Sequence, residues 1–290
     1  FDALEKQQKA DAENARQAEA GQQKVTKALD RLYFYKGRFG LAYDEINSRF
    51  GFVDKNGHTT IAFKYNTLWP FDEQGFARGV VKGFSTRDSY FLIDTLGNEY
   101  RLATDIDQLD SNTTALDLRN RELSALPDAV CRHNQLKVLL LSNNQLSSLP
   151  DCIAALTNLH ILYLDNNRLV NLPTAFGQLD ALQTLTLQRN NLTRLPDGFA
   201  QLKNLRELDL GFNQMAQLPD GFGRLSKLVT FDGTYNSLTQ LPAGVGALEN
   251  LESLMLYNNQ LGSLPDDFGQ LIHLKSLNLS NNQISTLPAS

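Results

Sequence analysis

Eight of the nine prolines in this 290-residue chain are spaced 23 residues apart without exception. They are Pro127, Pro150, Pro173, Pro196, Pro219, Pro242, Pro265 and Pro288. A fixed period of about 20 to 50 residues is the signature of a solenoid, in which each repeat stacks on the next. This period therefore constrains the fold of residues 113–290 more strongly than any local propensity.

Two other kinds of residue keep the same period. A leucine precedes each of these prolines, and a column of asparagines comprises Asn144, Asn167, Asn190, Asn213, Asn236, Asn259 and Asn282. Ahead of each asparagine lies an alternating stretch such as Leu162-Tyr163-Leu164, which predicts a short strand with the leucines inward and the middle residue outward. Asparagine can donate and accept hydrogen bonds at once, and proline, which lacks an N–H, ends the strand. We therefore expect one strand per repeat and a ladder of asparagines beside the strands.

The resulting unit, L-x-x-L-x-L-x-x-N-x-L-x-x-L-P-x-x-F-x-x-L-x-x, resembles the leucine-rich repeat family over residues 113–290. Its 23-residue L-P form is similar to repeats of bacterial and intracellular signalling proteins of the Ras-group and Roco kinds. The resemblance implies an α/β solenoid, a right-handed horseshoe with a parallel sheet on its concave side. It gives eight units, the last one incomplete, and we expect the natural chain to continue beyond Ser290.

Two segments precede the repeats. Residues 1–32 are rich in Ala, Gln, Lys and Glu, which predicts a helix or a linker, with a short coiled-coil contact as the alternative. Residues 33–112 are rich in aromatic residues, and F-G-F-V-D-x-x-G from Phe50 recurs forty residues later as Y-F-L-I-D-x-x-G from Tyr90. Each D-x-x-G is a hairpin-type turn.

The segment Y-x-x-x-W-P-F-x-x-x-G-F-A, from Tyr65 to Ala77, resembles the middle of a bacterial WG β repeat. That resemblance implies a small antiparallel β module and a bacterial source. Because the second copy runs directly into repeat 1, we expect the module to act as the N-terminal cap of the array.

Catalytic and metal-binding patterns are missing from the sequence. It has no phosphate-binding loop, nucleophile elbow or H-E-x-x-H motif, and its four histidines lie in different units. We therefore predict no catalytic residue, no cofactor and no metal site. The net charge of −5 argues against nucleic acid as a partner, and no apolar run reaches the ~20 residues that span a membrane.

The two cysteines, Cys131 and Cys152, fall on adjacent turns of the solenoid but in different columns. We favour free thiols. The alternatives are a disulfide on the convex side and a metal site that includes His133.

The outward positions of the predicted strands and the turns after them form the candidate binding surface. Its proposed partner-binding residues are Tyr163, Arg189, Asp209, Phe212, Asp232, Tyr235, Met255 and Tyr257. Aromatic residues beside an arginine and carboxylates are typical of interface hot spots, although scattered surface aromatics are also common. We favour solvated carboxylates for Asp209 and Asp232 over an acid–base or cation-binding pair.

One repeat departs from the pattern, because Gly233 replaces an inward leucine while Phe231 enlarges its neighbour. We favour compensation inside the core over a local kink.

These features favour a non-enzymatic module that binds an unknown protein partner on the concave surface and belongs to a larger bacterial protein. One alternative is the sensor region of a signalling enzyme, with a Roco-like GTPase or another effector beyond Ser290. Another is a bacterial surface adhesion protein. The lack of a leader and of cysteine-rich caps slightly favours the cytoplasm over the cell surface, and the oligomeric state stays open.

Overall fold

The computed structural model describes residues 32–83 and 87–288. The chain divides into two compact units, Phe1–Arg101 and Leu102–Ser290. The helix expected over residues 1–32 lies outside the described residues, apart from its last position.

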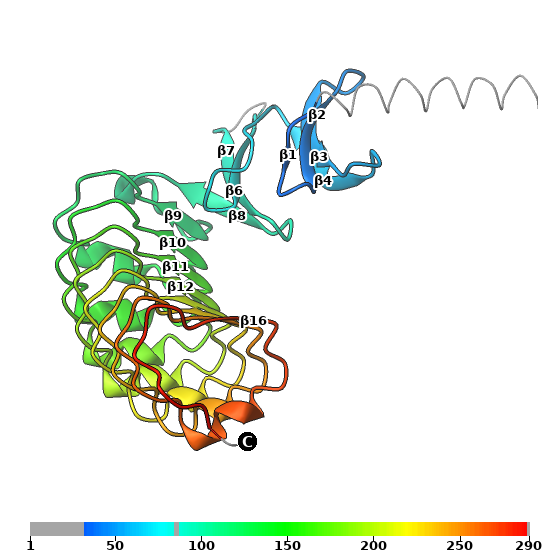
Figure 1. Cartoon of the computed structure of the whole chain (residues 1–290). Coiled ribbons are helices and arrows are strands. Elements are labelled where there is room, and N and C mark those ends of the chain that lie inside the picture. The colour runs from blue at the N-terminus through cyan, green and yellow to red at the C-terminus, as the bar shows by residue number, and fades with distance from the viewer. Residues whose placement is uncertain (1–31, 84–86, 289–290) are drawn as a thin grey trace, which may run out of the picture. The chain divides into compact units, whose positions relative to one another are not determined.

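The N-terminal unit is built from antiparallel hairpins (Figure 1), in agreement with the expected small β module. One sheet has the order β1-β2-β3-β4, and β5 to β8 pair antiparallel in sequence order. The strands are β1 (Phe34–Tyr35), β2 (Phe39–Asp44), β3 (Arg49–Val53), β4 (Thr59–Tyr65), β5 (Thr67–Leu68), β6 (Phe76–Val81), β7 (Ser89–Asp94) and β8 (Glu99–Ala103).

Its hairpins close with the turns that the sequence predicts. The amide of Gly57 donates to the carbonyl of Asp54 at 3.0 Å, and that of Gly97 to Asp94 at 3.0 Å. Both glycines have a positive φ, 86° and 84°, which explains why the turn needs glycine. A third turn of the same kind, which the sequence pattern did not predict, runs from Asp72 to Gly75.

Aromatic rings fill the core of this unit. The ring of Phe71 lies 4.9 Å from the rings of both Phe39 and Phe52, and 5.2 Å from that of Tyr35. The hydroxyl group of the fully buried Tyr65 donates to a carboxylate oxygen of Glu99, with the two oxygens 2.6 Å apart. Burial and this carboxylate raise the pKa of Tyr65 far above its ordinary value, so the hydroxyl stays protonated.

The repeat array has one three-residue strand per repeat, all parallel and in one register. Each residue faces the residue 23 positions later, as Leu162 faces Leu185. The sheet begins with Leu102 and Ala103 at the end of β8, which pair with β9. Its strands are β9 (Ala115–Asp117), β10 (Val138–Leu140), β11 (Ile161–Tyr163), β12 (Thr184–Thr186), β13 (Glu207–Asp209), β14 (Thr230–Asp232), β15 (Ser253–Met255) and β16 (Ser276–Asn278).

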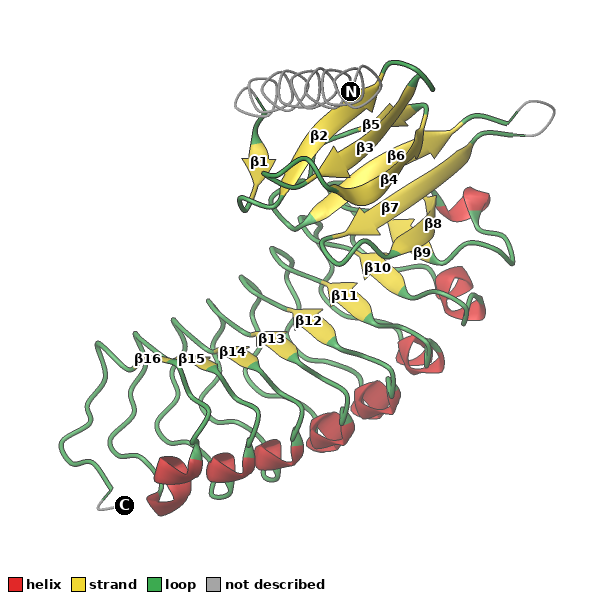
Figure 2. Ribbon diagram, turned by 90° about the vertical axis from the view of Figure 1, so that its right-hand side faces the viewer, coloured by secondary structure: helices red, strands yellow, loops and turns green. Residues whose placement is uncertain are grey.

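Short 3₁₀ helices cover the opposite side of the array (Figure 2), and the sheet lies on the inner side of its curve. They are η1 (Ile106–Gln108), η2 (Asp128–Arg132), η3 (Asp151–Ala155), η4 (Thr174–Gln178), η5 (Asp197–Gln201), η6 (Phe222–Arg224), η7 (Val245–Ala247) and η8 (Asp266–Gln270). The predicted α/β class is therefore wrong about the helices, since every helix in the described ranges is a 3₁₀ helix and none is an α-helix. The 23-residue repeat leaves room for only one such tight turn between a proline and the next strand.

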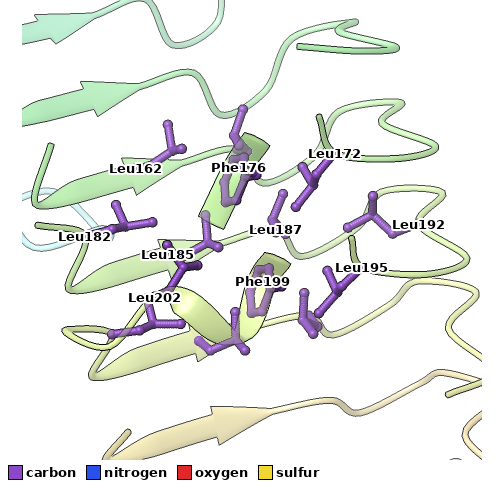
Figure 3. Close-up of a cluster of buried hydrophobic side chains, with 14 of the residues drawn as sticks. Leu162, Leu172, Phe176, Leu182, Leu185, Leu187, Leu192, Leu195, Phe199 and Leu202 are labelled. Atoms are coloured by element: carbon purple, nitrogen blue, oxygen red, sulfur yellow. The ribbon is translucent and has the colours of Figure 1, made fainter. Parts of the chain in front are cut away.

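Leucines from the strands and phenylalanines from the 3₁₀ helices form one continuous core (Figure 3). Phe176 and Phe199 are fully buried, and their rings stack with an interplanar angle of 2°. The helices stack so closely that a Cβ on Gly177 would overlap the carbonyl oxygen of Gly198. The fold thus depends on a small residue at this position as well as on the leucines.

The asparagine column bridges successive repeats. In repeat 4, the side-chain amide of Asn190 donates to the carbonyls of Leu187 and Leu164 at 3.0 Å, and its oxygen accepts from the amide of Leu169 at 3.0 Å. The other six asparagines make the same three bonds in their own repeats. Each one therefore satisfies backbone groups that no strand partner reaches.

The departure at repeat 6 is compensated within the core. A Cβ built on Gly233 would lie 3.0 Å from the ring of Phe231 and 3.0 Å from Leu256. Phe231 also contacts Phe222, with the ring centroids 5.0 Å apart. The large ring occupies the space that an inward leucine would fill, as the favoured interpretation predicts.

The expectation of free thiols is wrong. Cys131 in η2 and Cys152 in η3 form a disulfide, with their Cα atoms 5.7 Å apart. The bond joins repeats 1 and 2 on the helical side. The two cysteines occupy different columns, but the close stacking of the helices brings positions two residues out of register within bonding reach.

Candidate interaction surface

The predicted partner-binding residues come from the strands β11 to β15 and the turns that follow them. Tyr163, Asp209, Asp232 and Met255 each end a strand and are half-buried on the inner face of the sheet. Because the register is fixed, residues of neighbouring repeats lie side by side, as Asp209 does with Asp232.

The third residue after each strand has a left-handed backbone. In five repeats this residue is asparagine, which tolerates a positive φ, but in three consecutive repeats it is Arg189, Phe212 and Tyr235, with φ of 55°, 56° and 50°. The asparagines are Asn120, Asn143, Asn166, Asn258 and Asn281. Bulky side chains in this region are strained outliers, and such strain concentrates at functional sites.

These side chains form a continuous stack, which we call the aromatic ladder (Arg189, Phe212, Tyr235 and Tyr257). The guanidinium of Arg189 lies 4.8 Å from the centre of the Phe212 ring, and the rings of Phe212 and Tyr235 stack 4.3 Å apart at an angle of 14°. Tyr257 meets Tyr235 edge to face at 5.3 Å. Tyr235 is 44% exposed, so the ladder presents aromatic surface to solvent.

Beside the ladder lies a hollow of about 310 Å³ between β12 and β15, which we call the acidic hollow. The acidic residues Glu207, Asp209 and Asp232 line it together with Met255. The remaining lining residues are Thr186, Leu208, Thr230, Phe231 and Ser253.

The carboxyl group of Asp209 is not the solvated group that the sequence favours. One of its oxygens accepts from the amide of Gly211 at 2.8 Å, yet burial raises the pKa of Asp209 to about 7. The charges of Asp232 and Asp165 raise the pKa further. The site therefore disfavours the ionised form of Asp209 despite this hydrogen bond.

Asp165 is a residue of this surface that the candidate set did not include. Its carboxylate accepts from the hydroxyl of Thr186 at 2.6 Å and from the amide of Gln188 at 3.0 Å, and burial raises the pKa of Asp165. Glu207, also missed, ends up in the acidic hollow because its strand position is two residues before Asp209. The outward columns of the repeat contain both residues, so the period could have identified them.

The structure thus brings most of the predicted residues together in two adjoining groups. Arg189, Phe212, Tyr235 and Tyr257 form the ladder, and Asp209, Asp232 and Met255 line the hollow. Tyr163 ends β11 and lies outside the set that lines the hollow.

Neither a metal centre nor a membrane span is found within residues 32–83 and 87–288. In these ranges no three His, Cys, Asp or Glu side chains are placed to hold a metal ion together. Among the same residues, no helix has both the length and the apolar character needed to cross a bilayer.

Comparison with known families finds leucine-rich repeats over most of the array. Family models described as leucine rich repeat match residues 111–169 and 157–215, and a model for two copies of such repeats matches residues 234–290. Together the matches cover more than half of the chain. No curated protein matches the chain.

Several solved structures are similar to the chain. A leucine-rich repeat protein of Leptospira interrogans is 39% identical with a TM-score of 0.59, over 61% of this chain and 45% of that one. YopM, a leucine-rich effector protein from Yersinia pestis, is 30% identical with a TM-score of 0.51, over 60% and 51%. The ectodomain of the Arabidopsis receptor kinase HAESA, in complex with a peptide hormone ligand, is 33% identical with a TM-score of 0.53, over 61% and 30%. The matched region thus spans between about a third and a half of each of these proteins.

Proposed function

Because the chain belongs to the leucine-rich repeat family, we propose that it binds a protein partner on the inner face of its parallel sheet. Repeats of this kind generally serve as non-enzymatic scaffolds for protein–protein interaction. The proposed binding residues are those of the aromatic ladder and the acidic hollow, together with Tyr163.

The aromatic ladder is the observation that carries this proposal. Its three strained members occupy positions where five other repeats have asparagine, so the array could fold without them. Tyrosine and arginine are enriched among the few residues that dominate binding energy in interfaces. Because the face is preordered by the repeats, it loses little conformational entropy when a partner binds.

The solved structures are consistent with this use of the fold. The HAESA ectodomain binds a peptide hormone, and YopM is an effector protein. Two of the three relatives are bacterial, which agrees with a bacterial source. For this chain, the partner is a proposal based on the surface and not on those proteins.

The proposal extends in two ways to the rest of the molecule. The paired hairpins and repeated D-x-x-G turns support a WG-like module in residues 33–112. A role as the sensor region of a larger signalling protein is a finer proposal of the same kind, which the identity of the partner would test.

The test is a triple variant, Phe212→Ala, Tyr235→Ala and Tyr257→Ala, in a binding assay with partners captured from the source cell. We expect loss of capture with an unchanged far-UV circular dichroism spectrum. The matched control truncates two exposed apolar residues outside the sheet, Val170→Ala and Ile272→Ala. Unchanged capture by the triple variant, or equal loss in the control, would contradict the proposed site.

A further inference from the structure

We propose that the acidic hollow receives a lysine or arginine side chain of the partner, so that the chain recognises a basic segment of a protein. This inference rests on the proposed function and narrows it to a class of partner. It assigns different tasks to the two parts of the surface, with the hollow selecting charge and the aromatic ladder supplying contact area.

Charge in the hollow is the first reason. Its lining contains Glu207, Asp209 and Asp232 but no lysine, arginine or histidine. Asp232 faces Asp209 across neighbouring strands, and its charge raises the energy of the ionised form of Asp209. A cation between them would lower that energy, whereas an acidic or apolar side chain would not.

The shape and chemistry of the lining are the second reason. Met255 provides apolar side-chain atoms beside the acidic residues, whereas the side chains of Leu208 and Phe231 are buried in the core. A long basic side chain needs both kinds of surface, because its methylene stem packs on apolar atoms while its charged end makes polar contacts. The volume of about 310 Å³ suits one such side chain with part of its backbone.

The aromatic ladder is the third reason. Within this molecule Phe212 already stacks against the guanidinium of Arg189 at 4.8 Å, so the ladder is built of surfaces that accept cations. Tyr235 and Tyr257 continue the ladder into the next repeats and remain partly exposed. A Cβ at Gly211 would lie 3.1 Å from a carboxylate oxygen of Asp209 and 3.6 Å from one of Asp232, so glycine leaves the space beside both carboxylates unfilled.

A metal ion is the competing occupant of a group of carboxylates. In the part of the chain that the structure describes, these carboxylates are not arranged so that three of them reach one point. An organic cation, which is larger and is bound through separate hydrogen bonds, fits this spacing better than a divalent ion that needs several close oxygen ligands.

The experiment selects ligands without assuming their sequence. The immobilised full chain is used to select from a random dodecapeptide library displayed on phage, and the selected peptides are synthesised with a fluorescent label. Their affinity is measured by anisotropy against the wild type, against the double variant Asp209→Asn, Asp232→Asn, and against a matched control. The control, Asp197→Asn with Asp220→Asn, removes two exposed carboxylates outside the sheet.

We expect a lysine or arginine at one fixed position of the selected peptides. Replacing this residue by norleucine, or using the Asp209/Asp232 double variant, should each weaken binding by about tenfold or more, while the control stays within about twofold. The two changes together should weaken binding little more than either alone, because they remove the same contact.

Other results would overturn the inference. Peptides that lack a basic residue, or basic peptides that bind the double variant equally well, would refute the basic partner but leave the proposed function intact if Phe212→Ala, Tyr235→Ala still abolishes binding. Saturable binding of calcium chloride alone that is lost in the double variant would assign the hollow to a metal. Selection of no peptide, or of peptides indifferent to both pairs of substitutions, would count against the proposed function as well.

Discussion

The repeat array and the N-terminal β unit satisfy buried backbone groups in different ways. In the array, Asn190 bonds to two repeats at once, donating to Leu187 in its own repeat and to Leu164 in the one before. In the N-terminal unit, Asp94 accepts from the amides of Leu96 and Asn98, all within one hairpin turn. Asp94 also accepts from the hydroxyl of Tyr100 in the strand that follows, at 2.9 Å. The asparagine column therefore couples neighbouring repeats, whereas Asp94 bonds within its own hairpin.

This difference also decides what a departure from the pattern means. In the array, each position can be compared with the equivalent position in the other repeats. Phe212 is therefore recognised as unusual, because five other repeats have asparagine there. The N-terminal unit has two copies of the F-G-F-V-D-x-x-G type and a third D-x-x-G turn, too few to define what each position should contain. Substitutions can therefore be interpreted column by column in the array but only by local packing in the β unit.

The largest expected effect tests the coupling between repeats. Asn190→Ala leaves the amide of Leu169 without its side-chain acceptor and removes one of the two amide donors to each of the carbonyls of Leu187 and Leu164. One unsatisfied buried group and two lost hydrogen bonds should lower the free energy of unfolding of the array by about 3–5 kcal/mol. Urea denaturation measures the loss, and amide hydrogen exchange should show weakened protection in repeats 3 and 4 together. Asp94→Ala should instead weaken protection only around its own hairpin.

The control for this prediction is the next residue along the chain. Asn191 is exposed, so Asn191→Ala should change the stability by less than about 0.5 kcal/mol. If the two alanine variants were equally stable, the asparagine column would not be what joins the repeats, and the contrast between the two units would lose its physical basis.

Much of the fold of the array could be predicted from the sequence, because residues in the same column of the repeat have the same structural role. Leu162 and Leu185 had to face each other once the period was fixed at 23, and they do. In the N-terminal unit, the turns at Asp54 and Asp94 could be predicted because glycine is needed at a positive φ, but the turn at Asp72 was missed. It lacks the preceding alternating strand that marks the other two.

The candidate surface was predictable only in its parts. The outward columns of the repeat predicted that Phe212, Tyr235 and Asp209 lie on this surface. The repeat period alone could not predict that the two rings stack or that the Asp209 carboxyl is buried. Both depend on side-chain packing across strands, which a single column does not describe. The disulfide was misjudged for the same reason, because it crosses columns between Cys131 and Cys152.

The disulfide provides the second prediction, since it is a covalent link between repeats that the asparagine column already joins. It closes a loop with a sequence separation of 21, and its loss through Cys152→Ser should lower the stability of the oxidised protein by about 3 kcal/mol. Urea denaturation with and without dithiothreitol measures the effect, which reduction of the wild type should reproduce. Two reactive thiols in the native, unreduced protein would contradict the bond.

The third prediction uses pH to test the buried carboxyl group of the array. The unfolded chain releases the Asp209 proton near the ordinary value of 3.8, but the pKa of about 7 keeps the proton in the folded state. Between these values the unfolded state binds fewer protons, so this contribution to stability is complete below about pH 4 and is lost as the pH rises through 7. Asparagine at this position does not titrate.

We therefore expect Asp209→Asn to equal the wild type in stability at pH 3.5 and to exceed it at pH 8 by about 1–2 kcal/mol, since the group remains partly exposed. Thermal denaturation at several pH values measures the difference, and Asp197→Asn on the helical side serves as the control. A constant difference between variant and wild type across this range would show that the environment of Asp209 is no different from that of an exposed surface carboxylate.

The smallest expected effect concerns the strained column. Tyr235 has a φ of 50°, a backbone conformation that costs most L-residues about 1–2 kcal/mol and costs asparagine less. Both Tyr235→Asn and Tyr235→Ala remove the stack on Phe212, so the difference between them isolates the backbone. The asparagine variant should be more stable than the alanine variant by about 0.5–1 kcal/mol in urea denaturation, although both should lose partner binding. If the alanine variant were as stable as the asparagine variant, the left-handed backbone would not be strained. The unusual φ of Tyr235 would then give no support to a functional role for the aromatic ladder.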